Sequence, residues 1–429
     1  MDIRIGLLGC GTVGAGVIDL MRKRSNKISD MTGMRPSITR VLVRDLTKER
    51  GIDLDGAMLT TNPDDILSDP DIRIVIETIG GIEPARSYIL TALKAGKHVI
   101  TANKDLIALH GSEIIETADA AGVDILYEAA VGGAIPLIRP LKESLTANDI
   151  TDLLGIINGT TNYILTQMTE TGADFSEALK EAQDLGYAEA DPTSDVDGLD
   201  AARKLTILAT IGFHAKVNLS EVEVSGIRSV TAADVKYASE IGCVIKLLAS
   251  GTDRNGILSL RVSPTLVPKQ HPLAGVSGSY NALFVRGDAS GDLMFFGRGA
   301  GSLPTASSVV GDVIEALRNM RLNVSGRVSQ MVMPHKTVDP DGGSALRHYL
   351  RMSVVDQPGV FAKIAGLCGD EGLSMETVLQ KRASKGTAEV VIVTHEVKPE
   401  VIRRVVEAFR QMPSIKSIDC VMPVQPMTE

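Results

Sequence analysis

Short apolar runs alternate with helical patterns along the first third of the chain. Four such runs predict strands, at residues 3–8, 38–43, 72–77 and 98–101. The segment 84–95, opened by a proline and followed by Gly96, predicts a helix between the last two. This repetition is typical of a parallel, doubly wound α/β sheet, whose ligands bind at the carboxyl ends of the strands.

A glycine-rich turn joins the first predicted strand to the first predicted helix. It reads GCGTVG over residues 9–14, which is the spacing of a dinucleotide-binding loop. Gly9 permits the tight turn, Gly11 lets the backbone approach a pyrophosphate, and Gly14 allows close contact between helix and strand. We therefore predict a Rossmann-like domain whose loop contacts to the cofactor are Gly9, Gly11, Thr12, Val13 and Gly14.

The residues after two of the strands indicate which nucleotide binds. Arg44 and Asp45 follow the second strand, where an acidic residue reads the ribose of NAD. Arg44 comes first, and a guanidinium suits the 2′-phosphate of NADP, so we expect NADP while Asp45 leaves NAD possible.

The fourth strand ends at Thr101, so Thr101 and Lys104 are expected near the cofactor, with Lys104 facing the cleft.

An acidic block in the middle of the chain reads GYAEADPTSDVDGLDAARK over residues 186–204. Two of its charged residues, Asp200 and Lys204, are four positions apart and therefore lie on the same face of a helix. The helix that follows is too apolar to lie on the surface, so this pair is expected to point into a cleft. Alternatively, the acidic run is a solvated loop, and Asp200 and Lys204 form an ordinary ion pair on a helix. Lys104 can likewise be a solvated lysine after a strand.

The remaining pattern divides the chain into further units. Beyond residue 219 the texture predicts strands and turns, until a helix opens at 304–312 that we place against the nucleotide domain. After a polar linker, strand and helix patterns predict a ferredoxin-like βαββαβ unit. The expected domains are 1–135 for the nucleotide, completed by 304–330, an α+β substrate-binding and dimerisation domain at 136–303, a linker at 334–347, and a regulatory domain at 348–429.

Composition excludes several classes of protein. The chain has 429 residues and a net charge of −9, without the cationic run that nucleic-acid binding requires. No apolar stretch approaches the roughly 20 residues that span a bilayer, so a cytoplasmic protein is expected. The four cysteines and seven histidines are scattered, which predicts reduced thiols and no zinc site.

Four segments together resemble one family. The segments LLGCGTVGAGV, NGTTNYIL and GYAEADPTSDVDGLDAARK resemble homoserine dehydrogenases, and DQPGVFAKIAG resembles an ACT regulatory domain. The resemblance implies NAD(P)-dependent interconversion of L-homoserine and L-aspartate 4-semialdehyde, in the biosynthesis of threonine, methionine and isoleucine. It also implies that L-threonine binds the ACT domain as an end-product feedback inhibitor. A homo-oligomer, either a dimer or a tetramer, is expected as well.

The resemblance also assigns residues by position. The family's substrate-binding acid falls on Glu189, a further active-site acid on Asp195, the catalytic pair on Asp200 and Lys204, and the cleft lysine on Lys104. The backbone of a loop corresponds to the family's site for a monovalent cation, Na⁺ or K⁺, at Glu128, Val131, Gly133 and Ile135.

The residue types fit this chemistry. The cofactor transfers the hydride, so the protein must move a proton and hold an amino acid. Lys204 is expected to polarise the substrate oxygen with Asp200 and Lys104 to transfer the proton, although the two roles can be exchanged. Glu189 suits the substrate ammonium, and Gly159 and Thr160 the substrate carboxylate.

Two other functions compete with this interpretation. A nucleotide-sensing regulator with an ACT sensor and no turnover would leave the two lysines and the acids unexplained. An aspartate-semialdehyde dehydrogenase requires a nucleophilic thiol in the cleft, and Cys10 in the glycine loop is the one cysteine near it.

Overall fold

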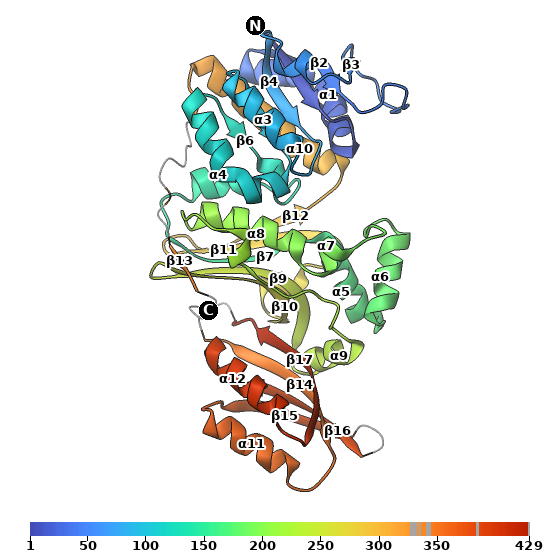
Figure 1. The fold of residues 1–429 in the computed structure, drawn as a ribbon, viewed down its shortest axis with the longest axis vertical. Helices are drawn as coiled ribbons and strands as arrows, with labels where there is room; N and C mark the ends of the chain where they lie inside the picture. The colour runs from blue at the N-terminus through green and yellow to red at the C-terminus, as the bar shows by residue number, and fades with distance from the viewer. Residues whose placement is uncertain (327–332, 334–335, 340–344, 383–385, 428–429) are drawn as a thin grey trace.

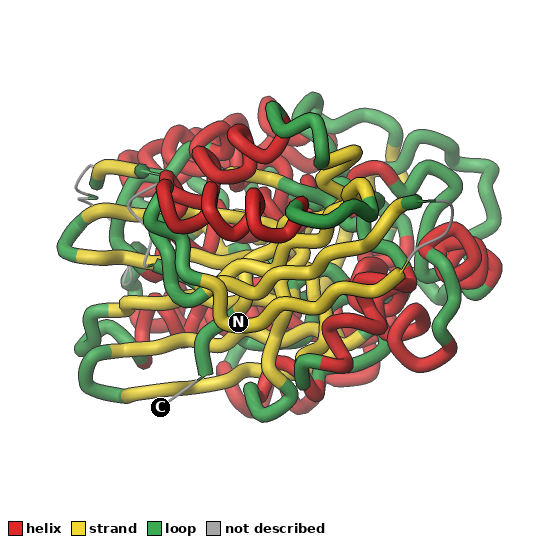
Figure 2. The backbone as a smooth tube through the Cα atoms, turned by 90° about the horizontal axis from the view of Figure 1, so that it is seen from below, coloured by secondary structure: helices red, strands yellow, loops and turns green. Residues whose placement is uncertain are grey.

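The computed structural model describes residues 1–326, 333, 336–339, 345–382 and 386–427. Figure 1 shows three parts stacked along the long axis of the molecule, from the blue N-terminal part through the green and yellow middle to the red C-terminal part. In the view along this axis, most helices lie toward the outside of the strands (Figure 2). Among the described residues, no helix is both long and apolar enough to cross a membrane.

The N-terminal part is built on a parallel sheet of six strands. Their order is β3-β2-β1-β4-β5-β6. The strands are β1 (Asp2–Leu8), β2 (Arg35–Leu42), β3 (Met58–Thr60), β4 (Ile72–Glu77), β5 (His98–Thr101) and β6 (Ile125–Leu126). The strand order reverses beside β1, which places a ligand crevice at the carboxyl end of β1. The predicted Rossmann-like sheet is therefore confirmed.

Helices cover both faces of this sheet. They are α1 (Thr12–Thr32), α2 (Asp64–Leu67), α3 (Ala85–Lys94), α4 (Lys104–Ala121) and, returning from much later in the chain, α10 (Ser302–Leu322). Helix α10 packs against α1, and its Val313 belongs to the same buried cluster as Ile5 and Val17. A Cβ on Gly16 would lie 2.7 Å from Ser302 Oγ, so the glycine permits this close approach.

The middle part is an antiparallel sheet with helices on one face (Figure 1). Its main strands have the order β12-β11-β7-β9-β10. They are β7 (Ile150–Ile156), β9 (Cys243–Arg254), β10 (Ile257–Pro268), β11 (Tyr280–Gly287) and β12 (Gly291–Arg298), and the short strands β8 (Glu223–Val224) and β13 (Thr337–Val338) pair with β10. The helices are α5 (Gly159–Thr171), α6 (Phe175–Asp184), α7 (Thr193–Val196), α8 (Leu199–Gly212) and α9 (Ala232–Glu240).

Helix α9 lies in a region for which the sequence predicts only strands and turns, and this expectation is wrong. A capping box begins the helix: Thr231 Oγ1 accepts from the backbone of Asp234, whose carboxylate accepts from the backbone of Thr231. The short helix has buried Asp234 and Tyr237 on its inner side, so its apolar periodicity is weak.

The C-terminal part has the predicted ferredoxin-like arrangement. Its elements are β14 (Arg347–Val355), α11 (Val360–Asp370), β15 (Met375–Arg382), β16 (Thr387–Thr394), α12 (Pro399–Arg410) and β17 (Ile415–Val424). The strands form an antiparallel sheet in the order β17-β14-β16-β15. The end of β17 pairs with β10 at Leu266 and Val424, which joins this sheet to the middle one. The predicted linker at 334–347 lies partly outside the described residues.

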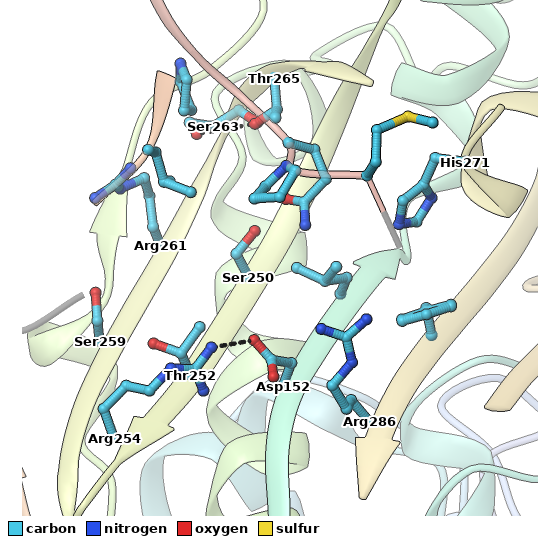
Figure 3. Close-up of a pocket in the computed structure, with 17 residues that line it drawn as sticks. Asp152, Ser250, Thr252, Arg254, Ser259, Arg261, Ser263, Thr265, His271 and Arg286 are labelled. Atoms are coloured by element: carbon cyan, nitrogen blue, oxygen red, sulfur yellow. Dashed lines mark hydrogen bonds and ion pairs between the residues drawn. The ribbon is translucent and has the colours of Figure 1, made fainter. Parts of the chain in front are cut away.

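The chain beyond β17 continues over the open face of the middle sheet. Gln425 and Met427 line a cavity of about 130 Å³ whose floor carries polar side chains of β7, β9 and β10 (Figure 3). Within it, Arg254 Nη2 donates to Asp152 Oδ1 at 2.7 Å. The C-terminal part therefore contacts the middle part through both its sheet and its last described residues.

Candidate active site

A buried carboxylate between two lysines forms the centre of the site. Asp200 is 4% exposed and lies in the first turn of α8. Its Oδ2 accepts from Lys204 Nζ at 2.7 Å, and its Oδ1 lies 3.0 Å from Lys104 Nζ. Lys204 Nζ also donates to the backbone carbonyl of Ile157 at 2.8 Å. The three catalytic candidates predicted from the sequence thus lie together.

Three helix N-termini bring these groups to one place. Helix α4 begins at Lys104, with Asn103 as its cap, and α8 begins at Leu199, next to Asp200. Helix α5 begins at Gly159, where the side chain of Asn158 caps the helix by accepting from Thr161 N. Because α4 belongs to the N-terminal part and the other two to the middle part, the site forms where these parts meet (Figure 1).

Burial and charge act in opposite directions on this cluster. Burial raises the pKa of Asp200, but Lys204 and Lys104 lower it by more, so its pKa lies below the usual range. Burial alone would lower the pKa of Lys104, but the charge and hydrogen bond of Asp200, together with the charges of Asp105 and Asp195, raise that pKa overall. At neutral pH, Asp200 is therefore an anion and Lys104 a cation able to donate a proton.

Asn158 is part of the site and was missed by the sequence analysis. Its Nδ2 donates to Asp195 Oδ1 at 2.7 Å and to Asp200 Oδ2 at 2.8 Å, so one amide links both acids. The available signal was its place before Gly159, because asparagine is a favoured helix cap. Its second role, as a donor to two carboxylates distant in sequence, has no local signature.

The other residues predicted to bind substrate lie around this cluster. Asp195, in α7, is held by Asn158, as described above. Glu189 is exposed, and its carboxylate has no hydrogen-bond or ion-pair partner among the described residues. Thr160 Oγ1 donates to the backbone carbonyl of Tyr187 at 2.7 Å, which ties the start of α5 to the acidic loop. Gly159 packs closely, since a Cβ there would lie 2.9 Å from the carbonyl oxygen of Ser279.

A cavity of about 680 Å³ lies at the carboxyl end of β1, with a volume suited to a nucleotide. Gly9, Gly11 and Arg44 line it, together with Lys48 and Arg50. Gly9 has a φ of +100°, and a Cβ on Gly14 would lie 2.3 Å from the Gly9 carbonyl oxygen, so both positions require glycine. Thr12 and Val13 form the start of α1 next to this loop.

Two charged side chains after β2 differ in their hydrogen bonding. Asp45 turns toward its own loop, where its carboxylate accepts from the backbone N and the hydroxyl of Thr47. Arg44 is exposed, and its guanidinium has no hydrogen-bond or ion-pair partner within the described part of the chain. The guanidinium is therefore available to a 2′-phosphate, whereas the carboxylate is already hydrogen bonded.

Thr101 lies buried at the end of β5, on the side of the cleft that leads to Lys104. Its hydroxyl donates to Glu77 Oε2 at 2.5 Å, and Glu77 Oε1 accepts from the backbone of Ile79 and Gly80. Ile79 and Gly80 line the cavity, so Thr101 helps to hold the loop after β4 in place.

The loop predicted to bind a monovalent cation is tightly fixed. The Glu128 carboxylate accepts from the backbone N–H groups of Leu137, Ile138 and Arg139 at 2.6–2.9 Å. The Gly133 carbonyl accepts from Ser308 Oγ at 2.6 Å. Val131 and Ile135 are buried on either side of this bend. The atoms of this loop that would bind a cation are backbone carbonyl oxygens, which suit Na⁺ or K⁺. The described residues contain no cluster of three or more His, Cys, Asp or Glu that could bind a different metal.

The cysteines do not provide an activated thiol. Cys10 is half-buried in the glycine loop, and burial raises the pKa of its thiol. Cys243, Cys368 and Cys420 are buried, with pKa values raised in the same way. A thiol with a raised pKa is a poor nucleophile at neutral pH, which disfavours the aspartate-semialdehyde dehydrogenase alternative.

A dinucleotide-binding sheet whose strand β5 leads directly to the Lys–Asp–Lys cluster, followed by a ferredoxin-like unit, is typical of a nicotinamide-dependent oxidoreductase. Comparison with known families agrees. The profile described as homoserine dehydrogenase, NAD binding domain, matches residues 9–128, that of homoserine dehydrogenase matches 136–314, and that of the ACT domain matches 348–414. The chain belongs to the homoserine dehydrogenase family, whose members are oxidoreductases acting on a CH–OH group.

Relatives match along nearly the whole length. Homoserine dehydrogenase of Synechocystis is 46% identical over 99% of this chain and 100% of its own, and that of Bacillus subtilis 45% identical over 92% and 91%. The crystal structure of a homoserine dehydrogenase from Thiobacillus denitrificans superposes with a TM-score of 0.94 at 40% identity, covering 99% of this chain and 98% of the other. A hyperthermophilic archaeal homoserine dehydrogenase in complex with NADPH has a TM-score of 0.63 at 27% identity, over 74% and 98%.

Proposed function

We propose that this protein interconverts L-homoserine and L-aspartate 4-semialdehyde, preferring NADP, in the biosynthesis of threonine, methionine and isoleucine. The observation that carries the proposal is the buried Asp200 carboxylate held between Lys104 and Lys204 beside the nucleotide cleft. Membership of the family supports the reaction, and the exposed guanidinium of Arg44, which has no partner in the described part of the chain, supports the nucleotide.

The hydrogen bonds of the two lysines support separate roles. When bound, the nicotinamide cofactor supplies or accepts the hydride. Two of the three N–H groups of Lys204 are used by Asp200 and Ile157, which leaves one to bind the substrate oxygen in a fixed position. Lys104 has one ion pair and a side chain 37% exposed, so its ammonium can donate the proton and recover it from water.

The groups around this centre suit the two ends of an amino acid. We assign the carboxylate of Glu189, which has no partner among the described residues, to the substrate ammonium. The N-terminus of α5, at Gly159 and Thr160, is assigned to the substrate carboxylate, because first-turn N–H groups favour an anion. Asp195 is assigned to substrate binding through its bond to Asn158.

We further propose that the ACT domain binds L-threonine as a feedback inhibitor. A cavity of about 360 Å³ beside the start of α11 is lined by Asp356, Gln357, Pro358 and Gly359, among others. Backbone N–H groups at this helix start can receive a carboxylate. We also propose that the protein forms a homo-oligomer, either a dimer or a tetramer. A monovalent cation is proposed to bind the backbone of one loop, at Glu128, Val131, Gly133 and Ile135.

Substitution of each lysine tests the proposed chemistry. Lys204→Ala and Lys104→Ala are expected to lower kcat for homoserine oxidation by about 10² to 10⁴, the usual effect of losing a group that moves a proton or polarises the substrate. Lys180→Ala, which removes an exposed pair with Asp184 on α6, is the matched control and keeps wild-type kcat. A Lys204 variant within threefold of wild type would overturn the assignment.

A further inference from the structure

Two neighbouring residues of α4 pair with α8 across the boundary between the N-terminal and middle parts. Lys104 pairs with Asp200, and the next residue, Asp105, lies 2.9 Å from Arg203 Nε. The charges alternate, so a cation and an anion of α4 face an anion and a cation of α8. The first pair belongs to the proposed chemistry, but the second contacts neither substrate nor cofactor in the proposed site.

The second pair is partly buried and connects to the acidic loop as well. The side chains of Arg203 and Asp105 are 26% and 34% exposed. Arg203 Nη1 also donates to Ser194 Oγ at 3.2 Å, and Ser194 precedes Asp195 in α7. The guanidinium, which is carried by α8, therefore contacts both α4 and α7, and Arg203 is the residue before Lys204 of the Lys–Asp–Lys cluster.

The geometric consequence concerns orientation. One ion pair fixes a distance between two helices but lets each turn about the contact. Two adjacent pairs fix the rotation as well, so the N-terminus of α4 can present Lys104 to Asp200 in one arrangement only. Proton transfer is sensitive to this, because a misplacement of about 1 Å can cost 10²-fold in rate.

We infer that Arg203 and Asp105 are positioning residues that lock α4 onto α8 and thereby align Lys104 with the substrate oxygen. The inference rests on the proposed role of Lys104. The cofactor is held by the glycine loop, and the acidic loop that binds the substrate stays attached to α5 through Asn158 and Thr160 when the bond from Arg203 to Ser194 is lost. Each ligand therefore keeps its binding groups without this pair. Loss of the pair should therefore lower kcat and leave both binding steps unchanged.

Three variants with one matched control test the inference. Arg203→Ala and Asp105→Asn are each expected to lower kcat about tenfold, with KM for homoserine and Kd for NADP within twofold of wild type. Arg203→Lys retains the charge and should recover most of kcat. The control is Arg228→Ala, which breaks an ion pair with Asp197 that lies wholly within the middle part; it should leave kcat unchanged.

A double-mutant cycle separates a shared role from two independent ones. If the residues act as one pair, Arg203→Ala/Asp105→Asn has the kcat of the slower single variant, whereas independent effects would multiply. The inference is overturned if both single variants keep kcat within twofold, if their effects multiply, or if kcat and KM change together. Lys104→Ala is measured in parallel: if it is active, the proposed function fails, and if it is inactive while the pair variants are normal, only this inference fails.

Discussion

At the scale of single residues, charge and hydrogen bonding decide which side chains remain available to ligands. Asp45 and Arg44 are adjacent after β2. The Asp45 carboxylate accepts hydrogen bonds from Thr47, whereas the Arg44 guanidinium has no partner among the residues that the structure describes. An NAD-preferring site needs the carboxylate free for the ribose, whereas an NADP site needs the guanidinium free. The sequence alone left both open because it shows the residues and not their partners.

Arg44→Ala is therefore expected to weaken NADP more than NAD, because only NADP carries the 2′-phosphate. A loss of about tenfold in kcat/KM for NADP, with NAD changed less than twofold, corresponds to one charge-assisted contact. Kinetics with both nucleotides at fixed homoserine measure this ratio. An unchanged ratio would move the choice to Lys48, Arg50 or the loop backbone.

Asp312 is a buried carboxyl that should make stability depend on pH. Burial, reinforced by Glu128, raises its pKa from 3.8 to about 7, although Arg139 at 2.9 Å acts in the opposite direction. A pKa raised by folding means that the folded state holds the proton more tightly. Its contribution to stability is present below pH 4 and is lost as the pH rises to 7.

Asp312→Asn removes this titration and keeps an oxygen that can accept from the backbone N–H of Glu128. The Tm of the variant relative to wild type should rise by a few degrees between pH 4.5 and pH 7.5, measured by calorimetry at several pH values. Parallel Tm profiles would show that Asp312 is ionised throughout this range.

At the scale of elements, Asn158 joins a structural role to a functional one. It caps α5 through its Oδ1 and bridges Asp195 and Asp200 through its Nδ2. Serine can also cap a helix but cannot supply an amide to both acids. The pair of variants Asn158→Ser and Asn158→Ala therefore separates the two roles.

Both variants are expected to lower kcat at least tenfold, because the acids lose their shared donor. Only Asn158→Ala should also lose about 1 kcal/mol of stability from the missing cap, seen as a lower Tm. Wild-type kcat in Asn158→Ser would mean that the cap alone matters and that the bridge does not support catalysis.

The elements also show how far sequence reasoning reaches. Strands β1, β4 and β5 and helices α3 and α8 were predicted because their apolar periodicity and end signals are local. Helix α9 was missed because its inner side carries Asp234, and the function of that carboxylate depends on Arg351, 117 residues later in the chain. Helical spacing predicts that Asp200 and Lys204 point together into a cleft, and the end of the fourth strand predicts the same of Lys104. Their contact is not a local property, because Lys104 and Asp200 meet through the docking of two parts of the chain.

At the scale of the whole molecule, a buried ionic network connects the ACT domain to the middle part. Arg351 of β14 donates from Nε and Nη2 to the two oxygens of Asp234 in α9, at 2.7 and 3.0 Å, and Tyr349 donates to the same carboxylate. Arg351 is 7% exposed and Asp234 fully buried. Helix α9 packs against α5, which begins at the active site. We propose this continuous contact as the route by which the ACT domain affects the site at Asn158.

Truncation near Asp341, which lies outside the described residues, removes the ACT domain and tests regulation. It also changes other properties of the protein. Truncation would remove Arg351 and Tyr349 from Asp234 and would expose the surface of the middle part that the ACT domain covers, so it changes more than the effector site. The double variant Arg351→Met/Asp234→Asn removes both charges of the buried pair, and the other two acids that pair with Arg351, Glu389 and Asp419, are partly exposed to solvent. Lys381→Met, which breaks an exposed pair with Glu240 across the same boundary, is its control.

The double variant is expected to keep kcat within twofold of wild type, because neither residue contacts the active site. Its half-inhibitory threonine concentration should rise at least about tenfold, since the effector can bias the catalytic part only through contacts that differ between two states. The control should respond to threonine as wild type does. If the double variant retains wild-type inhibition, coupling runs instead through the pairing of β17 with β10. If the wild type is not inhibited by threonine at all, the ACT domain serves assembly. The mass of the oligomer with and without that domain would show this.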